Sequence, residues 1–304
     1  MAALTFRQAE GAPPQDAAPA RAGRRRLTPY LLLLPGLAWL TIFFVVPIVT
    51  LLATSLQTPS PSGEIGAFDQ TFRFANFVDA ATAYGPQFTR AFLYAGIATV
   101  LALLIGYPLA YMIAFRSGRL RNLLLVLVVA PFFTSFILRT VAWRQILGEE
   151  GFIVPALKAL HLVPEDLALT ASGFAVVAGI TYNFLPFMTL PLYASIERLD
   201  PRLLEAGADL YGGPLTVLRK VTLPLTLPGI VAGTLLTFIP AAGDYVNASL
   251  LGSTKNTMIG NVVQSRFFQL VDYPTAAALS FVLMAAILVL VVIYIRRAGT
   301  EELV

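Results

Sequence analysis

The sequence predicts an all-α integral membrane protein with six transmembrane helices and a cytoplasmic helical loop between the fourth and the fifth. Three observations predict this class. Of the 304 residues, 57% are hydrophobic and 12% are charged, whereas a soluble domain carries roughly twice that charged fraction. Six apolar segments are each long enough to cross a bilayer, which takes about 20 residues. The basic residues lie mostly at the ends of these segments, which is typical of membrane topology rather than of nucleic-acid binding.

Composition excludes several kinds of site. The sequence has no Cys, which excludes disulfides, thiolate catalysis and Cys-based metal sites. The single histidine, His161, has no histidine partner, so we expect no metal site. Gly252-Ser253-Thr254-Lys255 has the letters of a phosphate-binding loop in the wrong order. The chain itself is therefore not expected to bind ATP, and no catalytic constellation is visible in it.

The N-terminal region combines a tail with the first span. Residues 1–28 are rich in Ala, Pro and Arg and lack a helical period, which predicts a disordered cytoplasmic tail. The apolar run of residues 29–56 is too long for the core of a signal peptide, so we expect an uncleaved helix. Residues 57–88 are polar and rich in Pro, Gly and aromatic residues, which predicts a loop outside the membrane.

Three spans follow this loop. The second covers residues 89–115, with Gly106 and Pro108 as expected bends. The third covers residues 122–147 and is expected to be interrupted by Pro131. A second outer loop is expected at residues 148–171, and the fourth span covers residues 172–195. The acidic residues of that loop are Glu149, Glu150, Glu165 and Asp166.

The last third of the chain holds the fifth and sixth spans. The fifth is expected over residues 225–251, with breaks at Pro240 and Gly243. A third outer loop follows at residues 252–273, and the last span covers residues 274–295. A cytoplasmic tail is expected at residues 298–304.

Residues 200–224, between the fourth and fifth spans, are neither apolar enough to enter a bilayer nor loose enough for a linker. Asp200 can cap a helix, Pro201 suits its first turn, and Gly212 with Gly213 and Pro214 stops it. Pro224 is expected to end a second, shorter helix. The first helix carries an apolar stripe at helical spacing, made of Leu203, Leu204, Gly207, Leu210 and Tyr211. We expect its small residues to let another surface approach closely: Ala206, Gly207 and Ala208.

The basic residues predict the orientation of the six spans. The segments assigned to the cytoplasm hold 14 of the 21 Lys and Arg residues, namely Arg7, Arg21, Arg24, Arg25, Arg26, Arg116, Arg119, Arg121, Arg198, Arg202, Arg219, Lys220, Arg296 and Arg297. The outer segments hold five, namely Arg73, Arg90, Lys158, Lys255 and Arg266. This asymmetry places both termini and the 200–224 loop in the cytoplasm.

Four polar residues are expected at membrane depth, where burial is costly. These are Arg139, Arg144, Asn183 and Asp244. Two interpretations of Asp244 carry equal weight. It either lies on a path for substrate, behind the break at Pro240, or forms a structural ion pair with Arg139 or Arg144. Arg144 can also extend to the outer interface.

The 200–224 loop resembles the EAA loop of type I ABC importer permeases, because Glu205-Ala206 opens the motif and Leu223-Pro224 closes it. In that family the loop docks in a cleft of the ATPase. The usual motif is Glu-Ala-Ala with a glycine six positions after the Glu. In this chain Gly207 replaces the second Ala, and Tyr211 replaces that glycine. The resemblance implies an ATPase-coupling role for Glu205, Ala206, Gly207, Asp209, Leu210, Tyr211, Gly212, Leu223 and Pro224.

Three further stretches are similar to spermidine/putrescine permeases of this family. They are residues 130–143, Tyr182-Asn183-Phe184-Leu185-Pro186, and the segment from Gly243-Asp244-Tyr245-Val246-Asn247 to Asn261. A polyamine is a flexible polycation, so its path needs carboxylates and ring faces. The substrate-path residues expected on this basis are Asp244, Tyr245, Trp143, Tyr182, Phe184 and Asn247.

The resemblance implies the type I ABC importer permease fold over a core of residues 89–297, preceded by a first helix and periplasmic loop at 29–88. It implies a bacterial inner-membrane complex with a second permease, a dimeric ABC ATPase and a periplasmic substrate-binding protein. Polyamine members use two different permeases, although the residues leave an identical mate open. ATP and Mg would belong to the ATPase, and this chain would hold no cofactor and bind no nucleic acid.

Two alternatives stay open. The same scaffold could import another small solute, such as an amino acid, an opine, a metal or an anion. A stand-alone secondary transporter or channel is a different class. It predicts an inverted repeat or carboxylate relays, and neither is visible in the sequence.

Overall fold

The computed structural model describes residues 28–161, 164 and 169–298. The tails expected at 1–28 and 298–304 lie almost entirely outside these residues, as do Glu165 and Asp166 of the second loop. The chain divides into two units, residues 1–50 and 51–304, which are described separately here.

The first unit contains the first apolar run, which is helical as predicted. It consists of α1 (Thr28–Leu40), the π-helical stretch η1 (Thr41–Val45) and the start of α2 (Val46–Ser55). The π-helical stretch precedes Pro47, whose ring nitrogen cannot donate a hydrogen bond. Apolar side chains surround this helix on all sides, which is typical of a membrane span.

The second unit begins with ordered structure where the sequence predicted only a loop at 57–88. An antiparallel hairpin pairs β1 (Gln57–Pro59) with β2 (Phe68–Gln70), and α3 (Ala75–Ala83) follows. The Asn76 side-chain amide donates to the backbone carbonyls of Ser55 and Gln57, at 2.9 Å each. The strands have three residues each, too few to show an alternating pattern in the sequence.

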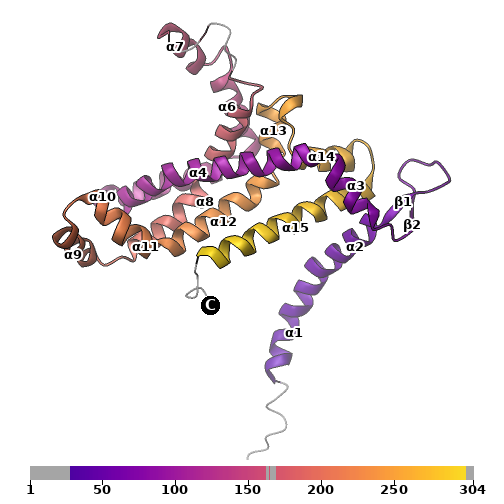
Figure 1. Ribbon diagram of the computed structural model, residues 1–304, viewed down its shortest axis with the longest axis horizontal. Helices are drawn as coiled ribbons and strands as arrows, with labels where there is room; N and C mark the ends of the chain where they lie inside the picture. The colour runs from indigo at the N-terminus through magenta and orange to yellow at the C-terminus, as the bar shows by residue number, and fades with distance from the viewer. Residues whose placement is uncertain (1–27, 162–163, 165–168, 299–304) are drawn as a thin grey trace, which may run out of the picture. The chain divides into compact units, whose positions relative to one another are not determined.

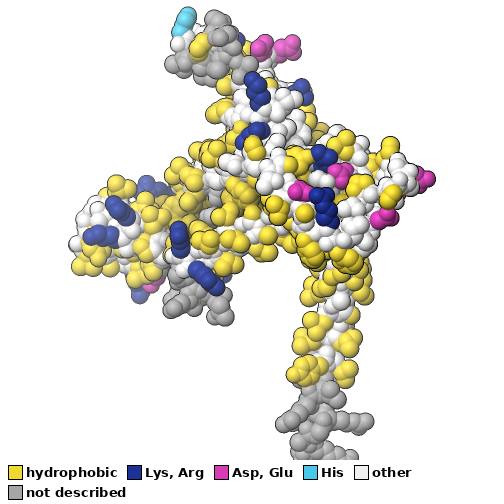
Figure 2. Space-filling view, turned by 45° about the vertical axis from the view of Figure 1, so that its right-hand side comes forward, with side chains coloured by type: hydrophobic (Ala, Val, Ile, Leu, Met, Phe, Trp, Pro, Cys, Tyr) yellow, Lys and Arg dark blue, Asp and Glu magenta, His cyan; other side chains and the backbone are white. Residues whose placement is uncertain are grey.

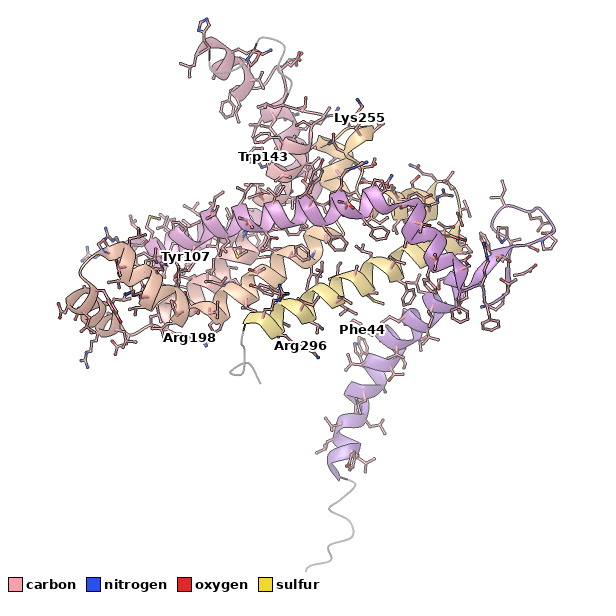
Figure 3. The ribbon with its side chains drawn as sticks, in the orientation of Figure 1. Phe44, Tyr107, Trp143, Arg198, Lys255 and Arg296 are labelled. Carbon is pink, nitrogen blue, oxygen red and sulfur yellow. The ribbon has the colours of Figure 1, made fainter. Side chains whose placement is uncertain are left out.

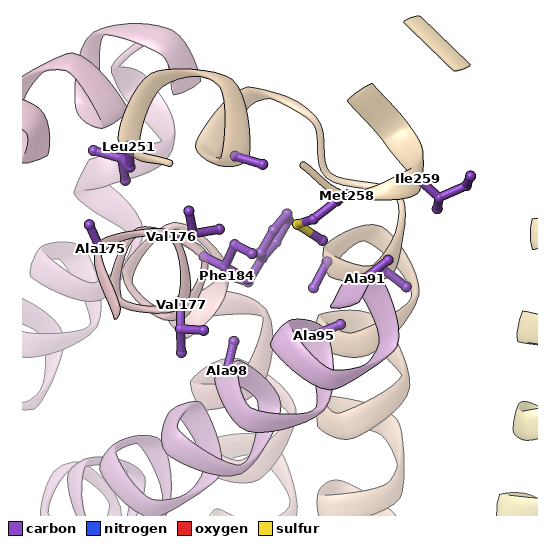
Figure 4. Close-up of a cluster of buried hydrophobic side chains, with 14 of the residues drawn as sticks. Ala91, Ala95, Ala98, Ala175, Val176, Val177, Phe184, Leu251, Met258 and Ile259 are labelled. Atoms are coloured by element: carbon purple, nitrogen blue, oxygen red, sulfur yellow. The ribbon is translucent and has the colours of Figure 1, made fainter. Parts of the chain in front are cut away.

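Three helices form the centre of the second unit (Figure 1): α4 (Gly85–Phe115), α8 (Gly173–Glu197) and α12 (Leu227–Ala242). The buried face of α4 carries small side chains at helical spacing, namely Ala91, Ala95, Ala98 and Ala102. Figure 4 shows Ala98 close to Val177 of α8 in the hydrophobic core. Small residues let helix backbones approach closely, as is common between membrane helices.

Gly106 and Pro108 do not interrupt α4, which runs unbroken past both residues. Gly106 instead lies against α8, where an added Cβ would come within 3.1 Å of Thr189 and 3.3 Å of Met188. Gly106, which was expected to bend α4, therefore allows α4 and α8 to pack closely.

The third apolar run is interrupted at Pro131 as predicted. A short turn η2 (Gly118–Leu120), α5 (Arg121–Val129) and η3 (Ala130–Phe133) lead to α6 (Phe136–Leu147). The two halves are bent by 99° at the break. The loop expected after this run contains a further helix, α7 (Ile153–Ala159).

A second bend lies where the fifth apolar run begins. Helix α10 (Pro214–Val217), η4 (Leu218–Thr222) and α11 (Leu223–Leu225) precede α12, and the two parts meet at 71°. Helix α12 ends at Ala242, and α13 (Val246–Leu251) follows Gly243-Asp244-Tyr245. The expected break is present at Gly243, whereas Pro240 lies inside α12 and does not interrupt it, contrary to the prediction.

The loop expected at 252–273 contains η5 (Thr254–Asn256) and α14 (Ile259–Phe268), and α15 (Tyr273–Ala298) closes the chain. Within the described residues, four helices are long and apolar enough to cross a membrane singly. The number rises to six if each bent pair counts as one span.

Candidate functional site: a helix pair and a buried polar cluster

The segment between α8 and α12 folds as a pair of short helices, α9 (Pro201–Tyr211) and the continuous turns of α10, η4 and α11. We call residues 200–225 the helix pair. Asp200 caps α9 as predicted, since its carboxylate accepts a 2.9 Å hydrogen bond from the Arg202 amide. Gly212 ends α9 with a φ of 78°, a left-handed conformation that glycine adopts without steric cost.

Gly207 is the contact point between the two helices of the pair. It is the one buried residue of α9, and an added Cβ would lie 3.1 Å from Val221 and 3.3 Å from Val217. The sequence interpretation assigned this close approach to another protein, but the chain's own second helix occupies it. Ala206 and Ala208 remain exposed.

The second helix of the pair does not end at Pro224, contrary to the sequence prediction. It continues to Leu225, and the chain turns at Thr226 into α12. There the Tyr107 hydroxyl of α4 lies 3.0 Å from the Thr226 hydroxyl. This hydrogen bond attaches the end of the helix pair to the central helices.

The outer surface of the helix pair combines apolar and charged side chains. Leu210 is 77% exposed, and Leu203 and Tyr211 are exposed too. The Lys220 ammonium lies 4.6 Å from the centre of the Tyr211 ring, a cation–π distance. Glu205 and Asp209 are also exposed, while Leu223 is half-buried. Most side chains of the apolar stripe predicted for α9 are therefore exposed and do not pack inside the helix pair.

A pocket of about 590 Å³ lies between this pair and the end of α4. Its lining is predominantly apolar and includes Tyr107, Tyr111, Leu204, Leu215 and Leu218. Figure 3 shows Tyr107 and Arg198 towards the helix pair, at the left of the view, and Trp143 and Lys255 farther from it.

The second candidate site is a buried cluster of polar side chains at the break after α12. Asp244 accepts hydrogen bonds from the backbone amides of Val246 and Asn247, at 2.8 and 3.1 Å. It therefore caps α13, and it also accepts from the Asn247 side-chain amide. Asn247 and Asp244 are 0% and 6% exposed.

Asn247 joins this cap to two other helices. Its side-chain oxygen accepts from Asn183 of α8 at 3.1 Å and from Thr140 of α6 at 3.3 Å. Asn183 also donates to the Thr140 hydroxyl at 3.0 Å. We call Thr140, Asn183, Asp244 and Asn247 the polar cluster. Thr140 was missed by sequence reasoning because a threonine inside an apolar helix carries no distinctive signal.

The ion pair considered for Asp244 is not formed. Within the described part of the chain, ion pairs join Arg73 to Asp79, Arg121 to Glu197 and Arg266 to Asp272. Arg139 is 9% exposed, and its Nε and Nη1 atoms have no hydrogen-bond partner among these residues. Arg144 is exposed.

The aromatic residues expected on a substrate path fall into separate groups. Trp143 and Tyr182 contact each other edge to face, with ring centres 5.4 Å apart. Phe184 packs between Phe136 and Phe187, at 5.9 and 6.0 Å. Tyr245 is 45% exposed and lines an apolar pocket of about 660 Å³ between α12, α14 and α15. Only Asp244 and Asn247 of the predicted set bond directly to each other.

Comparison with known proteins identifies the family. Residues 102–298 match the family described as the binding-protein-dependent transport system inner membrane component. The chain belongs to this family. It is also 37% identical over 260 residues to the spermidine/putrescine transport system permease protein PotB of Haemophilus influenzae, which covers 85% of this chain and 90% of that protein. The PotB protein of Escherichia coli K12 is 33% identical, with 86% and 94% covered.

A solved structure shares the fold at low sequence identity. It is a bacterial ABC transporter involved in the import of the acidic polysaccharide alginate, with a TM-score of 0.67 and 20% identity. The match covers 92% of this chain and 97% of the compared chain. The predicted fold class, a type I ABC importer permease, is confirmed.

Proposed function

We propose that this chain is a permease subunit of an ATP-driven importer and forms half of the membrane path for a polyamine. The observation that carries the proposal is the similarity to spermidine/putrescine permeases over 85% of this chain and 90% of the relative. Such coverage leaves no large part of either protein unmatched. The chain would be a transport subunit rather than an enzyme, with ATP hydrolysed by a partner.

The helix pair is the proposed contact with that ATPase. Its exposed surface offers apolar side chains, Leu203, Leu210 and Tyr211, beside the acidic groups Glu205 and Asp209. Apolar side chains surrounded by charges are typical of protein-binding surfaces. The hydrogen bond between Tyr107 and Thr226 would transmit a displacement of the pair to α4 and α12.

The charge distribution supports a cytoplasmic position for the helix pair. Figure 2 shows a group of Lys and Arg side chains over this end of the second unit, with most Asp and Glu side chains of this view elsewhere. Basic residues are enriched on the cytoplasmic side of membrane proteins. The hairpin and the loops around α7 and α14 would then face the periplasm, where a substrate-binding protein could dock.

The substrate path is proposed to pass the break at 243–245. Non-helical backbone at membrane depth is tolerated where it is covered by protein or lines a watery cavity. Trp143 and Tyr182 would present ring faces to ammonium groups. Asp244 would contribute negative charge near the path while its oxygens hold α13 and Asn247.

The proposal is tested by reconstituting the complete complex in liposomes, with the second permease, the ATPase and the binding protein. We expect ATP-dependent uptake of labelled spermidine or putrescine, and none without ATP or without the binding protein. A panel of amino acids and anions serves as the specificity control. Uptake of an anion with no uptake of any amine would refute the polyamine assignment.

A further inference from the structure

Arg139 of α6 is a buried charge without compensation from the described part of its own chain. The residue is 9% exposed, and its Nε and Nη1 atoms are buried without a hydrogen-bond partner among the described residues. Arginine does not lose its proton in proteins. A buried cation that is neither paired nor hydrogen-bonded is strongly unfavourable, so we expect a counter-charge in the assembled protein.

Three groups considered as partners of Arg139, Phe136, Thr140 and Asp244, do not provide this charge in the described residues. The Phe136 ring lies 5.6 Å from the guanidinium carbon and can contact its face, but the in-plane N–H groups still need acceptors. Asp244 forms no ion pair and instead accepts from Val246 and Asn247. Thr140, the next residue, bonds to Asn183 and Asn247.

Exposed apolar side chains precede Arg139 in the chain, and they are not covered by the described second unit. Ile137 is 55% exposed, Leu138 62% and Phe133 88%. Such a surface in a membrane protein is covered either by lipid or by another apolar protein surface. A buried guanidinium on the same segment favours a protein, because charged groups at membrane depth are almost always paired and face the interior of the assembly.

We propose that Arg139 binds a carboxylate of the second permease subunit and that this pair is part of the interface between the two membrane chains. This inference rests on the proposed function for the existence of the second subunit. A polyamine carries amines and no acidic group, so the substrate cannot supply the carboxylate. A carboxylate can accept two parallel hydrogen bonds from one edge of a guanidinium, which would satisfy one of the two orphaned nitrogen atoms together with Nη2.

The test measures assembly of the complex rather than transport. A tag on this chain captures the second permease from membranes in which all subunits are expressed. We expect Arg139→Gln to reduce the captured second permease roughly tenfold, because a buried carboxylate loses its partner. Arg144→Gln is the matched control, since Arg144 lies on the same helix and is exposed, and should capture as much as the original chain.

A charge exchange then identifies the partner. Arg139→Glu should abolish capture, and replacement of one acidic residue in a membrane span of the second permease by Arg should restore it. Because the chain has no Cys, Arg139→Cys can also be combined with a single Cys at that acidic position. We expect a bis-maleimide crosslinker to join the two cysteines, because an arginine and its carboxylate partner hold their Cα atoms farther apart than a direct disulfide allows.

Three results would overturn the proposal. Arg139→Gln could capture as much second permease as Arg144→Gln. The combination Glu165→Gln and Asp166→Asn in this chain could reproduce the Arg139→Gln defect, which would place the counter-charge within the chain. The defect could also vanish in membranes lacking anionic lipid, which would assign it to a lipid. A complex that needs Arg139 for assembly but imports no polyamine would refute the proposed function and leave this inference intact.

Discussion

At the scale of single residues, the orientation of the Asn247 side chain is dictated by its neighbours. Its oxygen accepts from Thr140 and Asn183, and its nitrogen donates to Asp244. An amide can satisfy both requirements in one orientation only, because its two ends differ. Three segments that are distant in the chain, α6, α8 and α13, are thereby joined through one side chain.

Asp244→Asn tests this arrangement. The new amide can still cap α13 with its oxygen, but its nitrogen then faces the nitrogen of Asn247, donor against donor. We expect a lower melting temperature of the purified complex and a lower transport rate, with the apparent affinity for polyamine little changed because the binding protein supplies most of it.

The double variant Asp244→Asn with Asn247→Asp exchanges donor and acceptor and should restore the melting temperature. If transport stays low in this stable double variant, the carboxylate is needed at position 244 itself. Full transport by a well-expressed Asp244→Asn chain would instead remove Asp244 from the substrate path.

Asn183→Ala removes the link between α8 and the polar cluster. We expect a loss of roughly 1–3 kcal/mol in the free energy of unfolding, because Thr140 and Asn247 lose a buried partner. Thermal unfolding of the purified complex measures the effect.

Thr181→Ala on the same helix is its control. Thr181 is buried, and its hydroxyl bonds to the Val177 carbonyl within α8. Equal losses in both variants would show that the cluster adds no stability beyond that of a bond within one helix.

At the scale of elements, the helix pair depends on a close contact between two short helices that are too short to be stable alone. Gly207 permits this contact with Val217 and Val221. The pair is in turn attached to α4 through Tyr107 and Thr226. Of the three adjacent small residues, Gly207 is the one that packs inside the pair, while Ala206 and Ala208 are exposed.

Gly207→Leu should separate the two helices. An added Cβ alone would lie 3.1 Å from Val221, so a branched side chain must push the second helix away, and overpacking of this kind costs roughly 1–3 kcal/mol. We expect faster proteolysis within residues 200–225, while the membrane helices remain inserted.

Ala206→Leu is the matched control, since Ala206 is exposed, and it should leave proteolysis unchanged. Equal protease resistance of the Gly207→Leu chain would contradict the close packing of the pair.

Leu210→Glu tests the proposed contact with the ATPase without disturbing the pair, because Leu210 is 77% exposed. We expect normal expression and protease resistance, but little stimulation of ATP hydrolysis by the loaded binding protein. Unchanged stimulation, measured as phosphate release from the reconstituted complex, would exclude this side of α9 from the contact.

At the scale of the whole molecule, two bent segments and the charge distribution bear on how the chain lies in a membrane. The bent segments are residues 118–147 and 214–242. Six crossings require each of the two bent segments to supply one span, and the second would do so through α12, because residues 214–225 belong to the helix pair. An even number of crossings places both termini on the same side, and the basic residues favour the cytoplasm.

Single cysteines test this topology, because the chain has none of its own. Gly63→Cys in the hairpin loop should react with an impermeant maleimide in intact cells. Ala208→Cys in the helix pair should react only after the cells are permeabilised. Both positions are exposed, so a failure to react reports the side of the membrane. Labelling of position 208 in intact cells would reverse the orientation.

Local signals in the sequence sufficed for the membrane class, the central helices, the Asp200 cap, the Gly212 stop and the break at Pro131. Each depends on residues close together in the chain, such as an apolar run, a capping carboxylate or a proline without an N–H group. The hairpin at 57–70 escaped prediction because its strands are shorter than any periodic signal.

The partners of Gly207, Asp244 and Arg139 depend on which distant helices meet. Composition and spacing identified Asp244 and Arg139 as costly polar residues at depth, yet an ion pair and a substrate contact were equally compatible with them. In the three-dimensional structure the Asp244 carboxylate accepts hydrogen bonds from α13 and from the Asn247 side chain. The Nε and Nη1 atoms of Arg139 have no hydrogen-bond partner among the described residues. A side chain's partner is set by how whole helices pack, and that packing joins residues more than a hundred positions apart, beyond the reach of any local pattern.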